Sequence, residues 1–245
     1  MLDFTTHGNP NRPAFLLLHA GGMTRQEWDP FLETWSKHFY LVVPSALAHG
    51  ASPNLPEIPI SVMADATIEL LDHLSIKKTH VIGSSMGGAI ALWLALTVGQ
   101  RIDKLIIFRT SYRSSAAVHE GVTRMAKPET WRKWRLERWM SQQHTPQGGP
   151  DAWIEVTKKV AAAFDFTTTD HAHDLGDLVT IRNPTLLITG DRDPVVPLDD
   201  MMDMYRSIPN AALWVMPNAT HFMGTDGWRR HAFEQEVLRF LRSRK

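Results

Sequence analysis

The stretch THVIGSSMGGAIALWLALTV, residues 79–98, decides the fold of this chain. It opens with a short apolar run, passes through the glycine-rich turn GSSMG at residues 83–87, and continues as a longer apolar run. This order is typical of a buried strand, a sharp turn and a buried helix. The turn matches G-x-S-x-G, and in a strand-turn-helix setting this motif presents its serine, Ser85, as a nucleophile at the end of the strand.

The glycines of this turn have a physical reason. Ser85 is expected to sit at a sharp, strained turn. Because the turn is sharp, side chains at Gly83 and Gly87 would collide with neighbouring backbone. The helix that follows is expected to present its first N–H groups to negative charge that forms beside Ser85. The alternative interpretation is an ordinary glycine-rich turn, including one that binds phosphate.

Short apolar runs alternate with longer helical patterns on both sides of this stretch. The runs are apolar on both faces and end in turn residues, which is typical of the central strands of a parallel sheet. The alternation predicts right-handed crossovers and an α/β fold with a doubly wound, mostly parallel sheet. The predicted strands are residues 14–19, 40–43, 79–83, 104–108, 185–189 and 212–216, and the predicted helices are residues 27–38, 60–74, 86–98, 198–208 and 228–241.

Residues 113–177 break this rhythm, because they contain no predicted strand and only two candidate helices, at residues 128–140 and 152–164. A loop rich in Pro and Gly separates the two helices. We predict a helical cap at residues 113–177, inserted in an α/β core made of residues 1–112 and 178–245. The cap is expected to cover a pocket at the carboxyl edge of the sheet, where folds of this class bind ligands.

Serine is a poor nucleophile at neutral pH and needs an adjacent base, which must itself be held in one tautomer. The strand at residues 185–189 runs into GDRDPVVP, residues 190–197, so an acid there is expected to reach the crevice that holds Ser85. We choose Asp193 over Asp191 as this acid. The alternative is that Asp193 only caps the next helix or holds the turn.

The predicted base is His221. The chain has 12 histidines, so the presence of any one of them means little. His221 is the only histidine in the loop after the last predicted strand, and it follows Ser85 and Asp193 in the order that this type of fold uses. Together the three side chains predict a Ser-His-Asp triad.

With these three residues in order, the sequence resembles the α/β-hydrolase superfamily along its whole length. It looks most like the small capped esterases, enol-lactonases and carbon–carbon hydrolases. The stretch LLLHAGG, residues 16–22, also carries the resemblance. The resemblance implies an oxyanion hole made by the backbone N–H groups of Gly21 and Met86, with Gly22 and Met23 as close competitors for the first position.

The sequence departs from the family pattern in two places. Ala20 replaces the usual glycine of the oxyanion turn. In PSALAHGAS, residues 44–52, Ser45 and Ala48 replace the usual Asp and Gly of the family's second loop. That loop is mainly structural in relatives, so we assign no chemistry to His49.

The resemblance sets the kind of pocket but not the substrate. The expected substrate contacts are Gly22, Trp131 and Met223, in an apolar or mixed pocket whose walls come largely from the cap. The segment FMGT, residues 222–225, lacks the Trp that often follows the catalytic His in carbon–carbon hydrolases. This departure weakens the hypothesis that the chain is a carbon–carbon hydrolase.

Composition excludes several other function classes. The chain has 26 Lys and Arg against 26 Asp and Glu, so no overall charge favours nucleic acid or an anionic membrane. It has no Cys, which excludes disulfides, thiolate nucleophiles and Cys-ligated metals. The first residues lack the pattern of a secretion signal, and the longest apolar run, residues 89–98, is about half of a membrane span. We expect a soluble, cytoplasmic protein.

Three weaker signals have bland alternatives. KPETWRKWRLERWM, residues 127–140, mixes Trp with basic residues, and we interpret it as an amphipathic cap helix; the alternatives are a grip on a substrate carboxylate, on single-stranded nucleic acid or on a membrane. DHAHD, residues 170–174, resembles a metal cluster, but its spacing suggests no third ligand, and we predict no metal. Arg109 and Arg113 either face the pocket or are surface charges.

These observations favour a serine hydrolase that cleaves a small carboxylic ester or lactone through an acyl-enzyme, without metal or organic cofactor. Cleavage of a carbon–carbon bond in a vinylogous diketone is an alternative that uses the same residues. A receptor-like ligand-binding protein with negligible turnover is a third hypothesis, which the complete triad disfavours. The expected partner is a small-molecule ester, lactone or diketone, with no nucleic acid and no membrane; the oligomeric state is open, a homodimer included.

Overall fold

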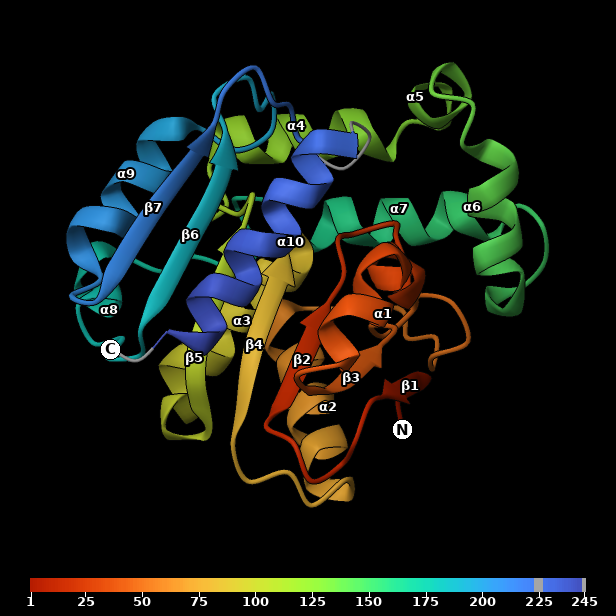
Figure 1. Cartoon of the computed structure of the whole chain (residues 1–245). Helices are drawn as coiled ribbons and strands as arrows, with labels where there is room; N and C mark the ends of the chain where they lie inside the picture. The colour runs from red at the N-terminus through yellow and green to blue at the C-terminus, as the bar shows by residue number, and fades with distance from the viewer. Residues whose placement is uncertain (223–226, 244–245) are drawn as a thin grey trace.

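The computed structural model describes residues 1–222 and 227–243. Within them one sheet has seven strands in the order β1-β3-β2-β4-β5-β6-β7 (Figure 1). All neighbouring strands are parallel except β1, which runs antiparallel to β3. The strands are β1 (Phe4–His7), β2 (Ala14–Leu18), β3 (Tyr40–Pro44), β4 (Thr79–Ser84), β5 (Ile102–Phe108), β6 (Thr185–Gly190) and β7 (Ala211–Met216). The predicted α/β class with a doubly wound, mostly parallel sheet is confirmed.

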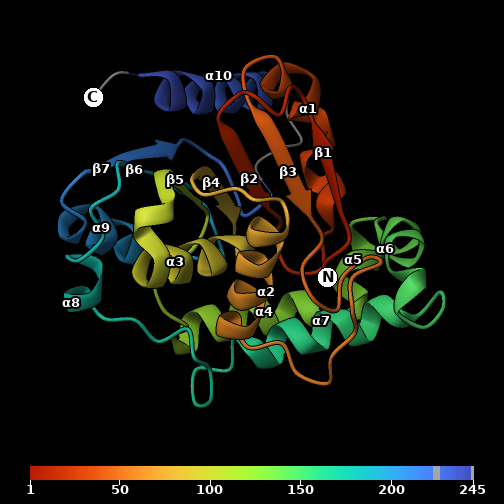
Figure 2. The same ribbon diagram turned by 90° about the horizontal axis from the view of Figure 1, so that it is seen from below.

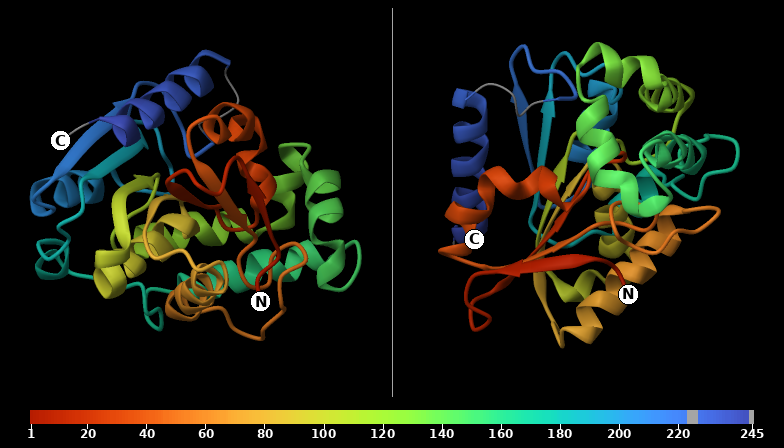
Figure 3. Two further views of the ribbon diagram at one scale, coloured as in Figure 1. Left: turned by 60° about the horizontal axis from the view of Figure 1, so that its bottom comes forward. Right: turned by 90° about the vertical axis from the view of Figure 1, so that its right-hand side faces the viewer.

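Helices cover both faces of the sheet (Figures 2 and 3). The α-helices are α1 (Asp29–Ser36), α2 (Ile60–His73), α3 (Met86–Val98), α4 (Ala116–Ala126), α5 (Pro128–Lys133), α6 (Glu137–His144), α7 (Ala152–Ala163), α8 (Leu175–Leu178), α9 (Leu198–Ser207) and α10 (Gly227–Arg242). Short 3-10 turns are η1 (Arg25–Trp28), η2 (Gly99–Arg101) and η3 (Thr145–Gln147). No helix in the described part of the chain has both the length and the apolar character needed to cross a membrane.

The strands separate two apolar layers because successive side chains point to opposite faces. Phe15 and Leu17 of β2 pack with α1 and α10, whereas Leu16 and Leu18 pack with α2 and α3. Figure 2 shows the same division, with α1 and α10 on one side of the sheet and α2, α3 and α9 on the other. Both faces of the central strands are therefore buried, which explains their continuous apolar sequences.

The register of the sheet brings the loops after β2, β4 and β5 together at the carboxyl end of these strands. Leu18 at the end of β2 pairs with Gly83 of β4, and Ser84 at the end of β4 pairs with Phe108 at the end of β5. Because the strands are parallel, the turns that follow them leave the sheet side by side. This edge carries the turn after His19 and the serine of the G-x-S-x-G motif.

Helices α4 to α7, which follow β5 in the chain, lie beyond the carboxyl ends of β2 and β4 (Figure 1). Arg113 and Ala172 form an isolated antiparallel bridge, so the two ends of the segment between β5 and β6 lie together. The prediction of one helix over residues 128–140 is wrong, because α5 and α6 are separate and Arg135 between them has a φ of 61°. Helix α4 is absent from the prediction, while α7 agrees with it.

The edge strand β1, with the sequence FTTH, is also absent from the predicted strands. It has no continuous apolar run, because an edge strand is partly exposed and pairs on one side only. Its existence follows from antiparallel pairing with β3, which local sequence does not report.

Candidate active site

Ser85 lies on the tight turn between β4 and α3. Its backbone has a φ of 51° and a ψ of −114°, a strained combination for a residue other than glycine. A Cβ at Gly83 would collide with the Gly87 carbonyl, and a Cβ at Gly87 would collide with the Leu18 carbonyl. Both positions therefore require glycine, as the sequence predicts, and Ser85 itself is half-buried between the end of β4 and the start of α3.

The structure brings Ser85, His221 and Asp193 into one hydrogen-bonded line. His221 Nε2 lies 3.1 Å from Ser85 Oγ, and His221 Nδ1 lies 2.8 Å from Asp193 Oδ2. The side chains of His221 and Asp193 are 4% and 0% exposed. These distances place the imidazole between a hydroxyl and a carboxylate, the arrangement that a nucleophile, a base and an orienting acid require.

Asp193 also holds its own turn, as the alternative interpretation proposes. Its Oδ1 accepts hydrogen bonds from the backbone N–H groups of Val195 and Val196, at 2.8 and 3.0 Å. It does not cap the next helix, whose N-cap is Pro197. The other candidate acid, Asp191, is exposed. The carboxylate that contacts His221 is therefore that of Asp193.

The charges of this line favour a neutral base beside an ionised acid. Burial lowers the pKa of His221, and the hydrogen bond and negative charge of Asp193 offset this only in part. Burial by itself raises the pKa of Asp193, but hydrogen bonds and charge from His221 and the two backbone N–H groups outweigh it and leave the pKa below its ordinary value. A neutral imidazole at neutral pH is the protonation state of a general base.

The turn after β2 supplies the expected site of the oxyanion donor. Three of its N–H groups are occupied: Ala20 donates to Glu27 Oε2 at 2.7 Å, Gly22 to His49 Nε2 at 3.1 Å and Met23 to the Ala20 carbonyl at 3.0 Å. Within the described chain the N–H of Gly21 has no such acceptor. This difference favours Gly21 over its two competitors.

Met86, the other expected donor, is the first residue of α3. The N–H groups in the first turn of a helix have no partner inside the helix, so they are available to an anion. The N–H groups of Gly88 and Ala89 return to the carbonyl of Ser85, at 2.8 and 3.1 Å. The position of Met86 directly after Ser85 fits an oxyanion donor.

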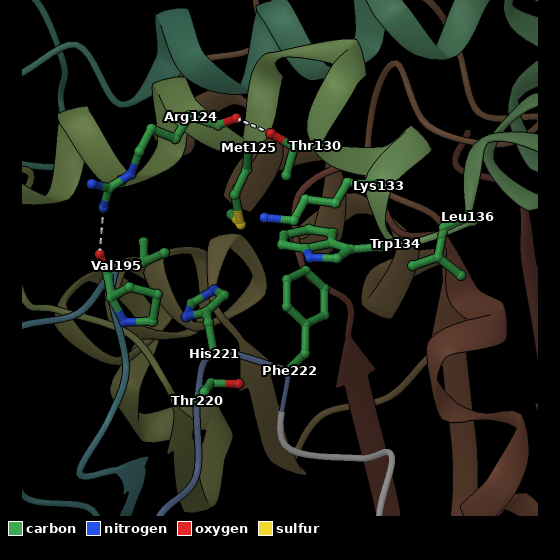
Figure 4. Close-up of a pocket in the computed structure, with 12 residues that line it drawn as sticks. Arg124, Met125, Thr130, Lys133, Trp134, Leu136, Val195, Thr220, His221 and Phe222 are labelled. Atoms are coloured by element: carbon green, nitrogen blue, oxygen red, sulfur yellow. Dashed lines mark hydrogen bonds between the residues drawn. The ribbon is translucent and has the colours of Figure 1, made fainter.

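A cavity of about 700 Å³ opens beside His221 (Figure 4). Its walls are mainly apolar and come from α4, α5 and the loops after β6 and β7. Two cations, Arg124 and Lys133, also line it, and in Figure 4 the side chains of Lys133 and Met125 both point toward its middle. The apolar wall residues are Met125, Trp134, Leu136, Pro194, Val195 and Phe222.

A family model described as the alpha/beta hydrolase family matches residues 15–233. The chain belongs to this family. It is 25% identical to 3-oxoadipate enol-lactonase 2 of Acinetobacter baylyi, over 98% of this chain and 94% of that protein. It is 26% identical to 2-hydroxy-6-oxo-6-phenylhexa-2,4-dienoate hydrolase of Burkholderia cepacia, over 93% of this chain and 87% of that protein. The crystal structure of a hydrolase from Pseudomonas aeruginosa PA01 matches with a TM-score of 0.77 and 26% identity, over 98% and 94% of the two chains.

In this alpha/beta hydrolase family member neither of the two predicted substrate contacts that the structure describes is found among the residues that line the larger cavity. Trp131 is buried and donates its Nε1–H to the Met125 carbonyl at 2.6 Å, beside a small hollow that Gly21 and Gly22 also line. Trp131 therefore packs beside the turn after β2, to which Gly22 belongs, and neither residue lines the larger cavity. Met223 lies outside the described residues.

Three buried histidines with no role predicted from the sequence contact the turn after β2. His49 Nε2 accepts the Gly22 N–H, and His144 Nε2–H donates to the Gly22 carbonyl at 3.0 Å. His19 Nδ1–H donates to the Ala20 carbonyl at 2.8 Å. Burial lowers the pKa of all three, that of His144 to about 4. All three act as neutral rings with fixed tautomers.

The remaining sequence signals have structural roles. Asp170 of the DHAHD segment accepts the N–H groups of Ile60 and Ser61 at the start of α2, at 3.0 and 2.8 Å. Among the residues described, no three His, Asp or Glu side chains are arranged to hold a metal ion. Arg113 is exposed over the Tyr112 ring, as a surface charge. Arg109 is buried, so its surface-charge alternative is wrong.

Proposed function

We propose that this family member is a serine hydrolase that cleaves a small carboxylic ester or lactone through an acyl-enzyme. The observation that carries the proposal is the hydrogen-bonded line from Ser85 Oγ through His221 to Asp193. Ser85 Oγ attacks the carbonyl carbon while His221 Nε2 takes its proton. The same proton passes to the leaving alkoxide, and the acyl group remains on Ser85.

Hydrolysis of the acyl-enzyme repeats these steps with water. His221 takes a proton from water, hydroxide adds to the acyl carbon, and the proton returns to Ser85 Oγ as the acid leaves. The N–H groups of Gly21 and Met86 stabilise the oxyanion in both tetrahedral intermediates. Two such donors are worth several kcal/mol, because they are fixed before the charge forms (about 3 kcal/mol or more for each).

We infer further that residues 113–177 act as a cap and that the substrate carries a carboxylate. The cap contributes Arg124 and Lys133 to a cavity that is otherwise mainly apolar. A substrate with an apolar body and one anionic group would match both parts of this wall. Two relatives are named for carboxylates, 3-oxoadipate and 2-hydroxy-6-oxo-6-phenylhexa-2,4-dienoate, which supports the same substrate class.

The test is turnover by wild type and Ser85→Ala on p-nitrophenyl esters, lactones and half-esters of dicarboxylic acids. We expect Ser85→Ala to lower kcat by several orders of magnitude with the fold intact, and a fluorophosphonate to label Ser85 in wild type only. Near-normal turnover by Ser85→Ala would rule the mechanism out.

Cleavage of a carbon–carbon bond in a vinylogous diketone is the second candidate. It is favoured by the 26% identity to the phenylhexadienoate hydrolase over most of both chains. Loss of the coloured dienoate chromophore on mixing with wild type, at a kcat above that for every ester, would select this reaction over ester cleavage.

A further inference from the structure

A buried ion pair lies directly behind the proposed active site. Arg109, the first residue after β5, places its Nη2 2.6 Å from Oε1 of Glu27 in η1. The two side chains are 6% and 11% exposed. Arg109 has a φ of 48°, in the left-handed region that non-glycine residues rarely adopt. Burying two charges costs desolvation free energy, so stability alone is a weak reason for such a pair.

The pair contacts all three segments that carry the proposed chemistry. Glu27 Oε2 accepts the N–H of Ala20, the residue before the proposed oxyanion donor, at 2.7 Å. Ser84, the residue before the nucleophile, donates to Glu27 Oε1 at 2.9 Å and accepts from Arg109 Nε–H at 3.0 Å. Arg109 Nη1–H donates to the carbonyl oxygen of His221.

We propose that Glu27 and Arg109 are positioning residues, which fix the oxyanion turn, the nucleophile turn and the His221 loop relative to one another. This role rests on the proposed function. The three segments leave different strands, β2, β4 and β7, and each is tied to the pair by at least one hydrogen bond. A misplacement of about 1 Å can cost about 100-fold in rate. One rigid anchor common to all three segments would therefore keep the reacting groups in the positions that catalysis requires.

The pair also acts on the charge of the base. Arg109 lowers the pKa of His221 and Glu27 raises it. Among the described residues, the other charged groups near the imidazole are Asp193, which contacts it, and the cations Arg124 and Lys133 across the cavity. Replacing either member of the pair therefore moves the pKa of His221, and the two replacements move it in opposite directions.

The experiment compares Glu27→Gln, Arg109→Met and the double variant with wild type. We expect kcat to fall about 10- to 100-fold in each, with KM changed much less, because the chemistry and not the pocket is disturbed. The pKa of His221, measured by NMR, is expected to fall in Glu27→Gln and to rise in Arg109→Met. The acid limb of kcat/KM should move with it.

Arg101→Met is the matched control. Arg101 pairs with Asp72 at 2.8 Å and donates to the Ile76 carbonyl at 2.7 Å, at the opposite end of β5. It should lose stability without a change in the pKa of His221. If a single variant fails to fold, kcat of the double variant tests the positioning role instead, because the double variant buries no unpaired charge.

A folded double variant with wild-type kcat would overturn the positioning role. Failure of the proposed function has a different signature: wild type would show neither turnover nor fluorophosphonate labelling that depends on Ser85. In that case the NMR titration still decides, because an unchanged pKa of His221 in both single variants would reduce the pair to a structural contact.

Discussion

Val160 of α7 lies directly against Gly21 of the turn after β2, so closely that a Cβ at Gly21 would stand 2.5 Å from Val160 Cγ1. The inserted segment is therefore packed on the turn itself. We expect Gly21→Ala to displace the turn and to lower kcat by about 100-fold. Removal of one donor from an oxyanion hole typically lowers kcat by this factor, and Gly21 is one of the two proposed donors. Steady-state kinetics on an activated ester measure the loss.

The Gly21→Ala prediction has a compensating variant and a control. Adding Val160→Ala removes the atoms that the new methyl would meet, and should restore at least part of kcat. Gly227→Ala, where no atom of the described residues lies within 4 Å of an added Cβ, should leave kcat unchanged. If Val160→Ala gives no recovery, the steric explanation is wrong.

Asp193→Asn keeps the shape of the acid but removes its charge. We expect kcat to fall about 10³- to 10⁴-fold with little change in KM, because the amide favours the wrong tautomer of His221 and no longer stabilises its protonated form. Stopped-flow acylation with a p-nitrophenyl ester checks this. A loss below tenfold would show that Asp193 only holds the turn of Val195 and Val196.

Stability should fall as the solution becomes acidic, in part through His144. Its pKa is about 4 in the folded chain against 6.5 for an unperturbed histidine. Between these values the unfolded chain binds a proton that the folded chain does not, so the free energy of unfolding decreases as pH falls from 6.5 to about 4. The contribution is about 3 kcal/mol.

Urea unfolding at several pH values tests the His144 prediction. His144→Gln should be less stable at pH 7, since it disturbs contacts to Gly22 and Gly50, but its stability should decline less steeply toward acid. Equal slopes in wild type and His144→Gln would contradict the prediction.

Lys133 is expected to select for an anionic group on the substrate. Lys133→Met should lower kcat/KM about tenfold for a half-ester of a dicarboxylic acid and leave neutral esters nearly unchanged, because one charge-assisted contact is lost. Arg132→Met is the matched control, since Arg132 is exposed and pairs with Glu137 at 2.9 Å. Equal effects on charged and neutral esters would remove Lys133 from substrate recognition.

Local pattern was enough for the central strands and for the turn at Ser85. A buried strand must be apolar on both faces, and a turn with crowded backbone must have glycine, so both leave a signal in adjacent residues. The same locality explains the misses. β1 exists through pairing with β3, and the break between α5 and α6 depends on how the inserted helices pack.

The sequence by itself determined the α/β class, the position of Ser85 and the chain order of Ser85, Asp193 and His221. Only the tertiary structure decided that Glu27 pairs with Arg109, that His144 contacts Gly22, and that Gly21 keeps a free N–H in the described chain. The reason is physical. Periodicity and turn chemistry are properties of neighbouring residues, whereas the partner of a buried charge or N–H is set by which strand ends meet at the edge of the sheet.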